Sequence, residues 1–384
     1  MPARSSFASA TRLAIIPAGA AAGVVAMTSQ LGTDYPSDAE PAISALARGD
    51  IHGFVSAPVQ MGPLSVLLRA PVAALAGPNS IWAYRLGALV CLLALVALAA
   101  LIAPRVSAGT GLLAALLLIL RPGTVDALHL GHPEEPLGAA LCVTALLLAR
   151  DHPIGSGIVL GAALATKQWA LVAIAPVLIA ALPAQRVRLA AVAAGVAALV
   201  IVPVAAADPH AFISALDHPA FGLSAMRTGN LWGFTAITET VPLGHGESTV
   251  VYLVPDWLQH IAHPLVAALT LGLGAAALRG RHKVDPLALF ALLMLVRCAL
   301  DPWNHAYYHT PFIVALIVWE VLEARRTPWL GALSAAWIGL VFHCSLPLSD
   351  VLYAVWALPM IGWLSLRAMR LEPGQASGQS LAAA

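Results

Sequence analysis

Long apolar stretches recur along nearly the whole chain, and this repetition restricts its possible folds more than any other feature. Most approach the roughly 20 residues that a helix needs to cross the hydrocarbon core of a bilayer. Leu, Ala and Val run through them without the alternation of polar and apolar residues that an outer-membrane barrel requires. The stretches cover residues 13–30, 80–103, 110–125, 136–149, 154–182, 189–206, 251–278, 286–300, 310–322, 329–346 and 351–366.

The stretch at 154–182 is too long for one span and contains Lys167. We divide it near that residue and predict about 11–12 transmembrane helices. Of the 384 residues, 60% are hydrophobic and 10% are charged, against roughly 45–50% and about 25% in soluble domains. This composition excludes a soluble enzyme, a nucleic-acid-binding domain and a single-pass receptor. The predicted fold class is an all-α polytopic integral membrane protein.

The positive charges predict how the chain crosses the membrane. With a cytoplasmic N-terminus, thirteen of the 20 Lys and Arg residues fall in loops on the cytoplasmic side, as the positive-inside rule requires. Most carboxylates fall in the alternate, outer loops. We therefore expect a plasma-membrane protein with both termini in the cytoplasm. Its first apolar stretch is expected to be an uncleaved helix and not a signal peptide.

Two outer segments are longer than simple turns. Residues 31–79 contain two short amphipathic stretches, 40–48 and 63–76, which we expect to lie as helices on the membrane surface, since the second is short and carries Arg69. Residues 207–250 form another outer loop, and loops of this length are usually functional or disordered. The predicted organisation is one transmembrane domain over residues 1–370 and a disordered cytoplasmic tail over residues 371–384.

Seven cations depart from the cytoplasmic pattern, and each lies in an outer loop or at the outer end of a helix. An Arg inside a span costs about 2.5–3.5 kcal/mol at the bilayer centre and less near the interface. Their convergence on one side favours a cavity for anions, since guanidinium and ammonium groups bind phosphate oxygens. Pairing with outer carboxylates or snorkelling to the interface is the alternative. The seven are Arg48, Arg69, Arg85, Arg121, Lys167, Arg227 and Arg297.

Four short segments hold the densest polar side chains: residues 33–40, 129–136, 166–169 and 301–309. In the first, Asp34 and Asp38 are candidates for a general base, and a helix-capping role is the alternative. No Walker loop, nucleophile elbow, metalloprotease motif or dinucleotide fingerprint is present, so the sequence does not support cytosolic nucleotide chemistry.

The second and fourth segments each allow two interpretations. Glu134 and Glu135 with His132 suit acceptor binding or a divalent ion, whereas a Pro-bounded turn that caps the next helix is the alternative. An interfacial aromatic belt explains the Trp and Tyr residues of 301–309. It does not explain Asp301 or the two histidines, which favour a functional role.

In these segments the chain resembles the GT-C membrane glycosyltransferases, and most closely glycosyltransferase family 87, the polyprenyl-phosphate-mannose-dependent mannosyltransferases of actinobacteria. The resemblance covers nearly the whole chain as an order of parts: a helix, a long outer loop with an early Asp, surface helices and then a bundle. Lys167 is similar to the family's basic residue after a small-residue helix, and His305 or His309 to its late outer-loop His. The loop motif is matched by Asp34 or Asp38, Ala42–Leu46, Gly49, Phe54 and Met61-Gly62-Pro63.

The resemblance implies that a polyprenyl-phosphate sugar enters from the bilayer as co-substrate. A hexosyl unit then passes, with inversion, to a cell-envelope lipid or glycan on the outer face, and a divalent metal is neither implied nor excluded. The catalytic candidates are Asp34 and Asp38. The candidates for binding the donor phosphate are Arg69, Arg85, Arg121, Lys167, Arg227, Arg297, His305 and His309. The candidates for binding the acceptor are His132, Glu134, Glu135, Asp301, Trp303, Asn304 and Tyr308.

A transporter or flippase of lipid-linked sugars is the main alternative function. Such a protein needs polar residues at mid-bilayer and access from both sides, often through broken helices. Here the polar residues gather at one face and the inner halves of most helices are plain Ala, Leu and Val. This distribution favours an enzyme with a one-sided site. A non-catalytic scaffold would leave the concentrated Asp, His and Arg side chains without a role.

Overall fold

The computed structural model describes the chain at residues 3–57, 61–217, 225–226, 228–244, 247–280, 284–343 and 348–369. In these ranges, five helices are long and apolar enough to cross a membrane, and seven further apolar helices are shorter. The predicted multi-span, mostly helical architecture is therefore confirmed. The predicted tail at 371–384 lies outside the described residues.

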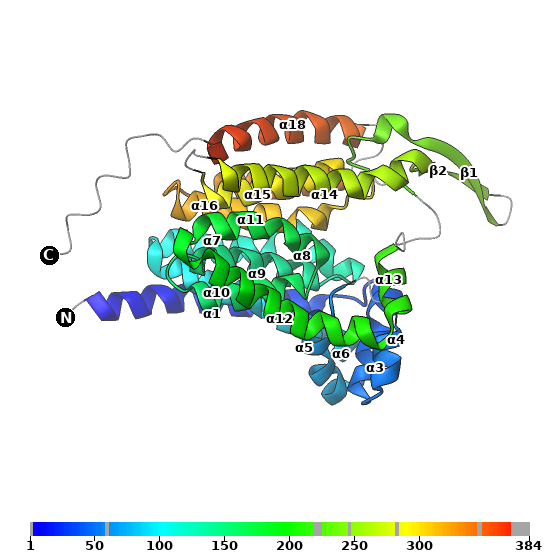
Figure 1. The fold of residues 1–384 in the computed structure, drawn as a ribbon. Coiled ribbons are helices and arrows are strands. Elements are labelled where there is room, and N and C mark those ends of the chain that lie inside the picture. The colour runs from blue at the N-terminus through cyan, green and yellow to red at the C-terminus, as the bar shows by residue number, and fades with distance from the viewer. Residues whose placement is uncertain are drawn as a thin grey trace.

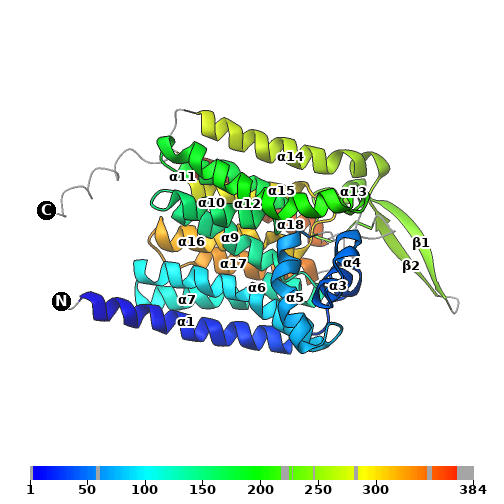
Figure 2. The same ribbon diagram turned by 60° about the horizontal axis from the view of Figure 1, so that its bottom comes forward.

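A helix occupies each predicted apolar stretch. The expected break near Lys167 is present, since one helix ends at Leu164, a 3-10 segment covers Gln168–Ala173, and the next helix begins at Ile174. Figures 1 and 2 show the long helices side by side, with the start of α1 and the finish of α18 at the same end of the bundle. The bundle comprises α1 (Ala3–Thr28), α6 (Ile81–Ile102), α7 (Ala108–Leu120), α8 (Pro122–Leu130), α9 (Glu134–Leu148), α10 (Pro153–Leu164), α11 (Ile174–Ala180), α12 (Arg186–Ala207), α14 (Asp256–Arg279), α15 (Pro286–Leu300), α16 (Thr310–Leu322), α17 (Trp329–His343) and α18 (Leu348–Met369).

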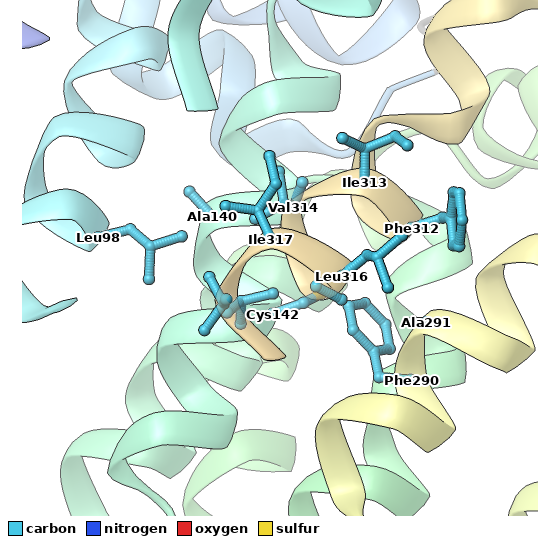
Figure 3. Close-up of a cluster of buried hydrophobic side chains, with 14 of the residues drawn as sticks. Leu98, Ala140, Cys142, Phe290, Ala291, Phe312, Ile313, Val314, Leu316 and Ile317 are labelled. Atoms are coloured by element: carbon cyan, nitrogen blue, oxygen red, sulfur yellow. The ribbon is translucent and has the colours of Figure 1, made fainter. Parts of the chain in front are cut away.

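The centre of the bundle is formed by helices that are apolar on all sides. Every residue of α16 is buried, and Phe312 and Leu316 pack with Phe290 of α15 in the cluster of Figure 3. Small residues bring other helices close together: a Cβ added at Gly157 or Gly161 of α10 would lie 2.8 or 2.6 Å from backbone oxygens of α12. This spacing of two small residues four apart is the usual way for membrane helices to approach closely.

Four short helices lie at the opposite end of the bundle from the start of α1 (Figure 2). The two predicted surface helices are present at Glu40–Ala47 (α3) and Pro63–Ala76 (α5). The short helix α2 (Tyr35–Asp38) precedes them, and α4 (Ile51–Ser56) lies between them. Buried Ile43, Phe54 and Val66 pack together beneath them. We call this group the jaw helices.

The second predicted outer loop contains regular structure that the sequence did not indicate. It holds a helix, α13 (Pro209–Asp217), and an antiparallel hairpin of β1 (Ile237–Gly244) and β2 (Glu247–Leu253), with Thr240 opposite Val250. The predicted apolar stretch from 251 therefore begins in a strand, and its helix starts only at Asp256. A run of β-branched residues favours the strands, because such side chains pack well on a pleated surface.

Candidate active site

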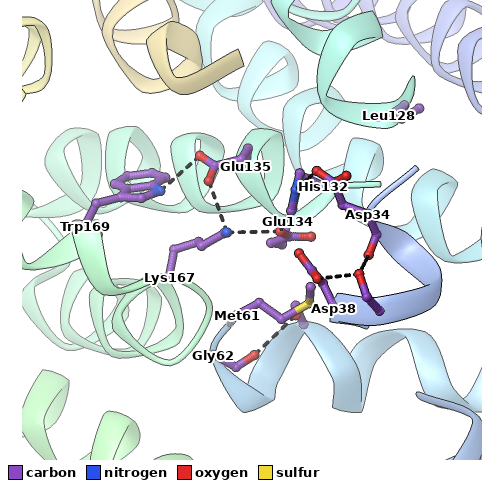
Figure 4. A network of polar contacts seen from close by, with 12 residues as sticks. Asp34, Asp38, Met61, Gly62, Leu128, His132, Glu134, Glu135, Lys167 and Trp169 are labelled. Atoms are coloured by element: carbon purple, nitrogen blue, oxygen red, sulfur yellow. Dashed lines mark hydrogen bonds and ion pairs between the residues drawn. The ribbon is translucent and has the colours of Figure 1, made fainter. Parts of the chain in front are cut away.

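Charged side chains from three separate parts of the sequence meet at the jaw end of the bundle (Figure 4). Asp34 precedes α2 and Asp38 ends it. Glu134 and Glu135 occupy the first turn of α9. Lys167 lies in the break between α10 and the 3-10 segment at Gln168–Ala173.

Two glycines let the first of these segments cross the second. The backbone N–H of Asp34 donates to the carbonyl of Leu130 at 3.0 Å. A Cβ at Gly32 would clash with the backbone of Gly131, which has a φ of +102°. Only glycine adopts this conformation freely and also allows the two backbones to approach so closely.

A second crossing brings α5 against the Lys167 segment. The N–H of Gly62 donates to the carbonyl of Thr166 at 2.9 Å, and that of Leu64 donates to Ala165 at 3.0 Å. A Cβ at Gly62 would clash with the Ala165 carbonyl. This crossing places Arg69, two turns into α5, beside α9.

Glu134 is the centre of the charged cluster and is fully buried. Its Oε1 lies 3.0 Å from His132 Nδ1 and 3.1 Å from Lys167 Nζ. The other ring nitrogen of His132, Nε2, lies 3.3 Å from Asp34 Oδ2. A continuous chain of charged contacts thus joins Asp34 to Lys167.

The chain of charged contacts continues through Glu135. Lys167 Nζ lies 3.2 Å from Glu135 Oε1, and the indole N–H of Trp169 donates to Glu135 Oε2 at 3.0 Å. Lys167 therefore compensates two buried carboxylates at once. A buried carboxylate without such a partner is strongly disfavoured.

Two guanidinium groups beside the cluster have unused donors. Arg69 is 1% exposed, and its Nη1 lies 3.8 Å from Glu134 Oε2, while its Nε and Nη2 have no partner among the described residues. Arg297 lies over the rings of Trp169 and Tyr308, at 6.0 and 4.7 Å, and its buried Nη1 is likewise unpartnered in the described chain. Buried N–H groups are normally hydrogen-bonded, so both arginines are suited to an anion.

Outside the membrane spans, the titratable groups of the site have pKa values shifted in different directions. Burial lowers the pKa of His132, but the hydrogen bonds with Asp34 and Glu134 outweigh it and raise the value to about 9. Burial raises the pKa of Asp34, but hydrogen bonds from His132 and Thr33 lower it overall. The pKa of Asp38 is raised, chiefly by burial. At neutral pH the site therefore holds an imidazolium between ionised carboxylates.

An aromatic wall borders the same cluster. The ring of Tyr307 stacks on His132 with centroids 5.0 Å apart, and His305 and Tyr308 contact Tyr307 in turn. Tyr35 lies against the Arg69 guanidinium at 5.2 Å. Three aromatic residues beside the cluster were not among the predicted site residues, namely Tyr35, Tyr307 and Trp169. Each is one or two positions away in the sequence from a residue that was predicted.

Asp34, Asp38 and His132 also have the donor set for a metal, since one ligand atom from each lies within 4.8 Å of the others. The different set considered from the sequence, His132 with Glu134 and Glu135, has both glutamates paired with Lys167. An imidazolium held between two carboxylates cannot be a ligand, so an ion would first have to displace the proton from His132.

Two predicted phosphate-binding cations, Arg85 and Arg121, make none of the charged contacts described above. The Nε of Arg85 donates to the carbonyl of Ser29 at 3.0 Å, and its guanidinium lies over Trp82. Arg121 is buried, and none of its guanidinium nitrogens has a partner among the described residues. Arg227 lies outside the described residues.

The predicted acceptor residues Asp301 and Asn304 lie in a second polar network. Asp301 Oδ1 accepts from the backbone N–H of Trp303 at 2.9 Å, and Asn304 donates to the Gly229 carbonyl at 3.1 Å. Asn230 donates to the carbonyl of Asp301 and so ties the second outer loop to this segment. These contacts hold loops together.

His309 has both ring nitrogens engaged close to this network. Its Nδ1 lies 3.1 Å from the His305 carbonyl, and its Nε2 lies 2.8 Å from the Tyr353 hydroxyl. Since η5 (Ala306–His309) carries it between α15 and α16, His309 links α18 to the bundle. Of the two late histidines, His305 borders the charged cluster, since its ring contacts Tyr307, which stacks on His132.

Comparison with known proteins identifies the family of the chain. The family model described as glycosyltransferase family 87 matches residues 62–302, more than half of the chain. No curated protein matches. Among solved structures, the chain is similar to ArnT from Cupriavidus metallidurans bound to undecaprenyl phosphate, with a TM-score of 0.51 and 18% identity over 92% of this chain and 76% of that one. This similarity confirms the GT-C-like fold. The chain therefore belongs to glycosyltransferase family 87 and is a membrane glycosyltransferase of the GT-C type.

Proposed function

We propose that the protein transfers a mannosyl or other hexosyl unit from a polyprenyl-phosphate donor to a lipid or glycan of the cell envelope. The reaction takes place at the outer face of the plasma membrane, at the jaw end of the bundle, and both termini are cytoplasmic. The observation that carries the proposal is the single charged cluster centred on Glu134, which joins the Asp34 carboxylate to the cations Lys167 and Arg69.

The cations are suited to a lipid phosphate. Arg69 and Arg297 have unused buried N–H groups, and Lys167 adds a point charge. In a low-dielectric site such groups stabilise phosphate oxygens far more than in water. The similar ArnT structure was determined with undecaprenyl phosphate bound, which supports a donor of this class.

The transfer step follows from the position of Asp34. Its carboxylate takes the proton of an acceptor hydroxyl while that oxygen forms a bond to the anomeric carbon of the sugar. The bond from the anomeric carbon to the phosphate oxygen breaks, and the polyprenyl phosphate leaves with the electron pair. A single displacement of this kind inverts the anomeric configuration.

We assign the base to Asp34 and give Asp38 a supporting role. Hydrogen bonds from Thr33 and His132 hold both oxygens of Asp34, whereas Ser37 holds one oxygen of Asp38. A base that is already oriented avoids the entropy cost of positioning it during the reaction. The acceptor lies against the wall of His132, Tyr307 and Tyr308 that borders this carboxylate.

The test uses purified protein in liposomes with radiolabelled polyprenyl-phosphate mannose and a crude envelope lipid extract. Asp34→Asn should lower label transfer about 100- to 10,000-fold, the range for loss of a general base, while donor binding stays within about twofold. Asp38→Asn should lower label transfer less than Asp34→Asn does. Glu40→Gln on neighbouring α3 is the matched carboxylate control.

Two results would contradict the proposal. Equal transfer by wild type and Asp34→Asn would exclude Asp34 as the base. Movement of bound donor across the liposome membrane without transfer, with mannose and with other prenyl-phosphate hexoses, would assign the protein to the flippases.

A further inference from the structure

A hollow of about 770 Å³ lies between α16, α17 and α18, and none of its lining residues belongs to the charged cluster. The start of α16 follows η5, which packs against α8 at the jaw end. The hollow is lined by Glu320, near the other end of α16, and by the first turns of α17. It therefore opens at the end of the bundle opposite the candidate active site.

The helices α17 and α18 pack together at their jaw end, and the hollow lies beyond this contact. At the jaw end Val341, Tyr353 and Ala357 form a buried cluster, and the Trp337 indole donates to the Leu352 carbonyl at 3.3 Å. Further along, the facing segments 329–333 and 355–363 line the open space between the two helices.

Its walls are mostly apolar, and three of the side chains in them are exposed. Trp329, Leu333 and Val355 are 63%, 65% and 66% exposed, and Trp356, Met360 and Trp363 complete the lining. Large apolar side chains around a concave space are the usual lining of a ligand site, and 770 Å³ lies within the roughly 300–1,000 Å³ of such sites.

Exposed arginines stand at the inner mouth of the hollow. Arg326 lines it, and its side chain is 48% exposed. Arg367 is exposed and lies over the ring of Trp363, which also lines the hollow. Both cations are therefore adjacent to apolar walls and open to an anionic group.

The one carboxylate in the lining is already compensated. Glu320 is 1% exposed, accepts from the backbone N–H groups of Leu330 and Gly331 at the start of α17, and lies 3.1 Å from Arg326 Nε. It thus caps α17 and holds Arg326 in place. The terminal nitrogens of Arg326 have no ion pair within the described ranges.

We propose that this hollow binds an anionic diacyl phospholipid of the cytoplasmic leaflet, its acyl chains between α17 and α18 and its phosphate at Arg326 and Arg367. Basic pockets between transmembrane helices on the cytoplasmic side are typical sites for such head groups. The proposed donor phosphate belongs to the other end of the bundle, so the two lipids do not compete. Only the assignment to the cytoplasmic leaflet rests on the orientation proposed above.

The test is native mass spectrometry of delipidated, full-length protein titrated with phosphatidylglycerol and with phosphatidylcholine of the same acyl chains. We expect tighter binding of phosphatidylglycerol. Each arginine near a membrane surface contributes about a fivefold factor, so Arg326→Gln/Arg367→Gln should weaken phosphatidylglycerol binding about 30-fold. Leu333→Trp should weaken both lipids by filling the hollow.

Two further variants separate binding from misfolding. Arg367→Gln leaves the Glu320–Arg326 pair intact and should still cost about fivefold. Arg150→Gln, an exposed cation after α9 at the same end of the bundle, should change nothing. Equal binding of the two lipids, equal losses in Arg150→Gln, or displacement of phosphatidylglycerol by polyprenyl phosphate would overturn the proposal. Because lipid binding is measured without a sugar donor, its failure is distinguishable from a failure of the transferase proposal.

Discussion

Replacement of Lys167 by Met tests whether the buried charges hold the candidate site together. The ammonium lies 3.1 and 3.2 Å from carboxylate oxygens of Glu134 and Glu135, which are 0% and 1% exposed. Met keeps the apolar stem but leaves both carboxylates without their shared cation. Removing one partner of a buried ion pair costs about 3–5 kcal/mol, and we expect a loss of that order in the free energy of unfolding.

The loss of the Lys167 charge should destabilise Glu135 more than Glu134. In the variant, Glu134 still has His132 at 3.0 Å and Arg69 at 3.8 Å as positively charged partners. For Glu135, the hydrogen-bond donor that remains among the described residues is the Trp169 indole. Adding Glu135→Gln to Lys167→Met removes the less compensated charge and retains an acceptor for the indole. The double variant should therefore recover about 1–3 kcal/mol relative to the sum of the two single variants.

Equilibrium unfolding in bicelles, followed by circular dichroism, gives the free energy of unfolding of the wild type, the two single variants and the double variant. Lys167→Arg, which keeps the charge, is the control and should lose less than Lys167→Met. Additivity of the single variants within about 0.5 kcal/mol would refute the reasoning, since it would show that Lys167 and Glu135 act independently.

Three further predictions follow from the site. The raised pKa of His132 implies stabilisation that is complete below the unfolded value of about 6.5 and is lost as the pH rises through about 9, so thermal melts from pH 6 to 10 should lose this dependence in His132→Gln. Gly131→Ala combines a φ of +102° with a backbone clash at 2.6 Å and should cost about 2 kcal/mol or more in unfolding measurements, whereas Gly49→Ala, with a φ of +77° and open space, should cost about 1 kcal/mol. Arg297→Gln should weaken binding of the prenyl-phosphate donor about 10-fold or more, while Arg85→Gln should change it less than twofold, and equal losses would contradict the placement of the donor phosphate.

The helices were predictable because their cause is local. A bilayer requires apolar segments of limited length, so the apolar stretches and the break at Lys167 are visible in the chain itself. The helices α3 and α5 were predicted from another local pattern, a short amphipathic stretch in an outer loop. The hairpin was missed because its β-branched residues run directly into the apolar stretch of α14.

The candidate site was predictable as a list of residue types but not as an arrangement. Asp34, Glu134 and Lys167 were each identified as candidates, and the structure brings them together. Arg85 was indistinguishable from Arg69 in the sequence, because both are cations on the predicted outer side of the chain. The two differ in the direction of the side chain. Arg69 contacts the Tyr35 ring beside the cluster, whereas Arg85 donates to the Ser29 carbonyl just after α1.

By itself the sequence determined that this is a polytopic helical membrane protein with its polar chemistry at one face, since hydrophobicity and charge bias act segment by segment. Only the tertiary structure decided which charges share a site. That choice depends on two close backbone crossings, Gly32 with Gly131 and Gly62 with the Ala165 carbonyl. Contacts between residues about 100 positions apart leave no periodic pattern in the chain, so the grouping of Asp34, His132, Glu134 and Lys167 appears only when the loops are packed.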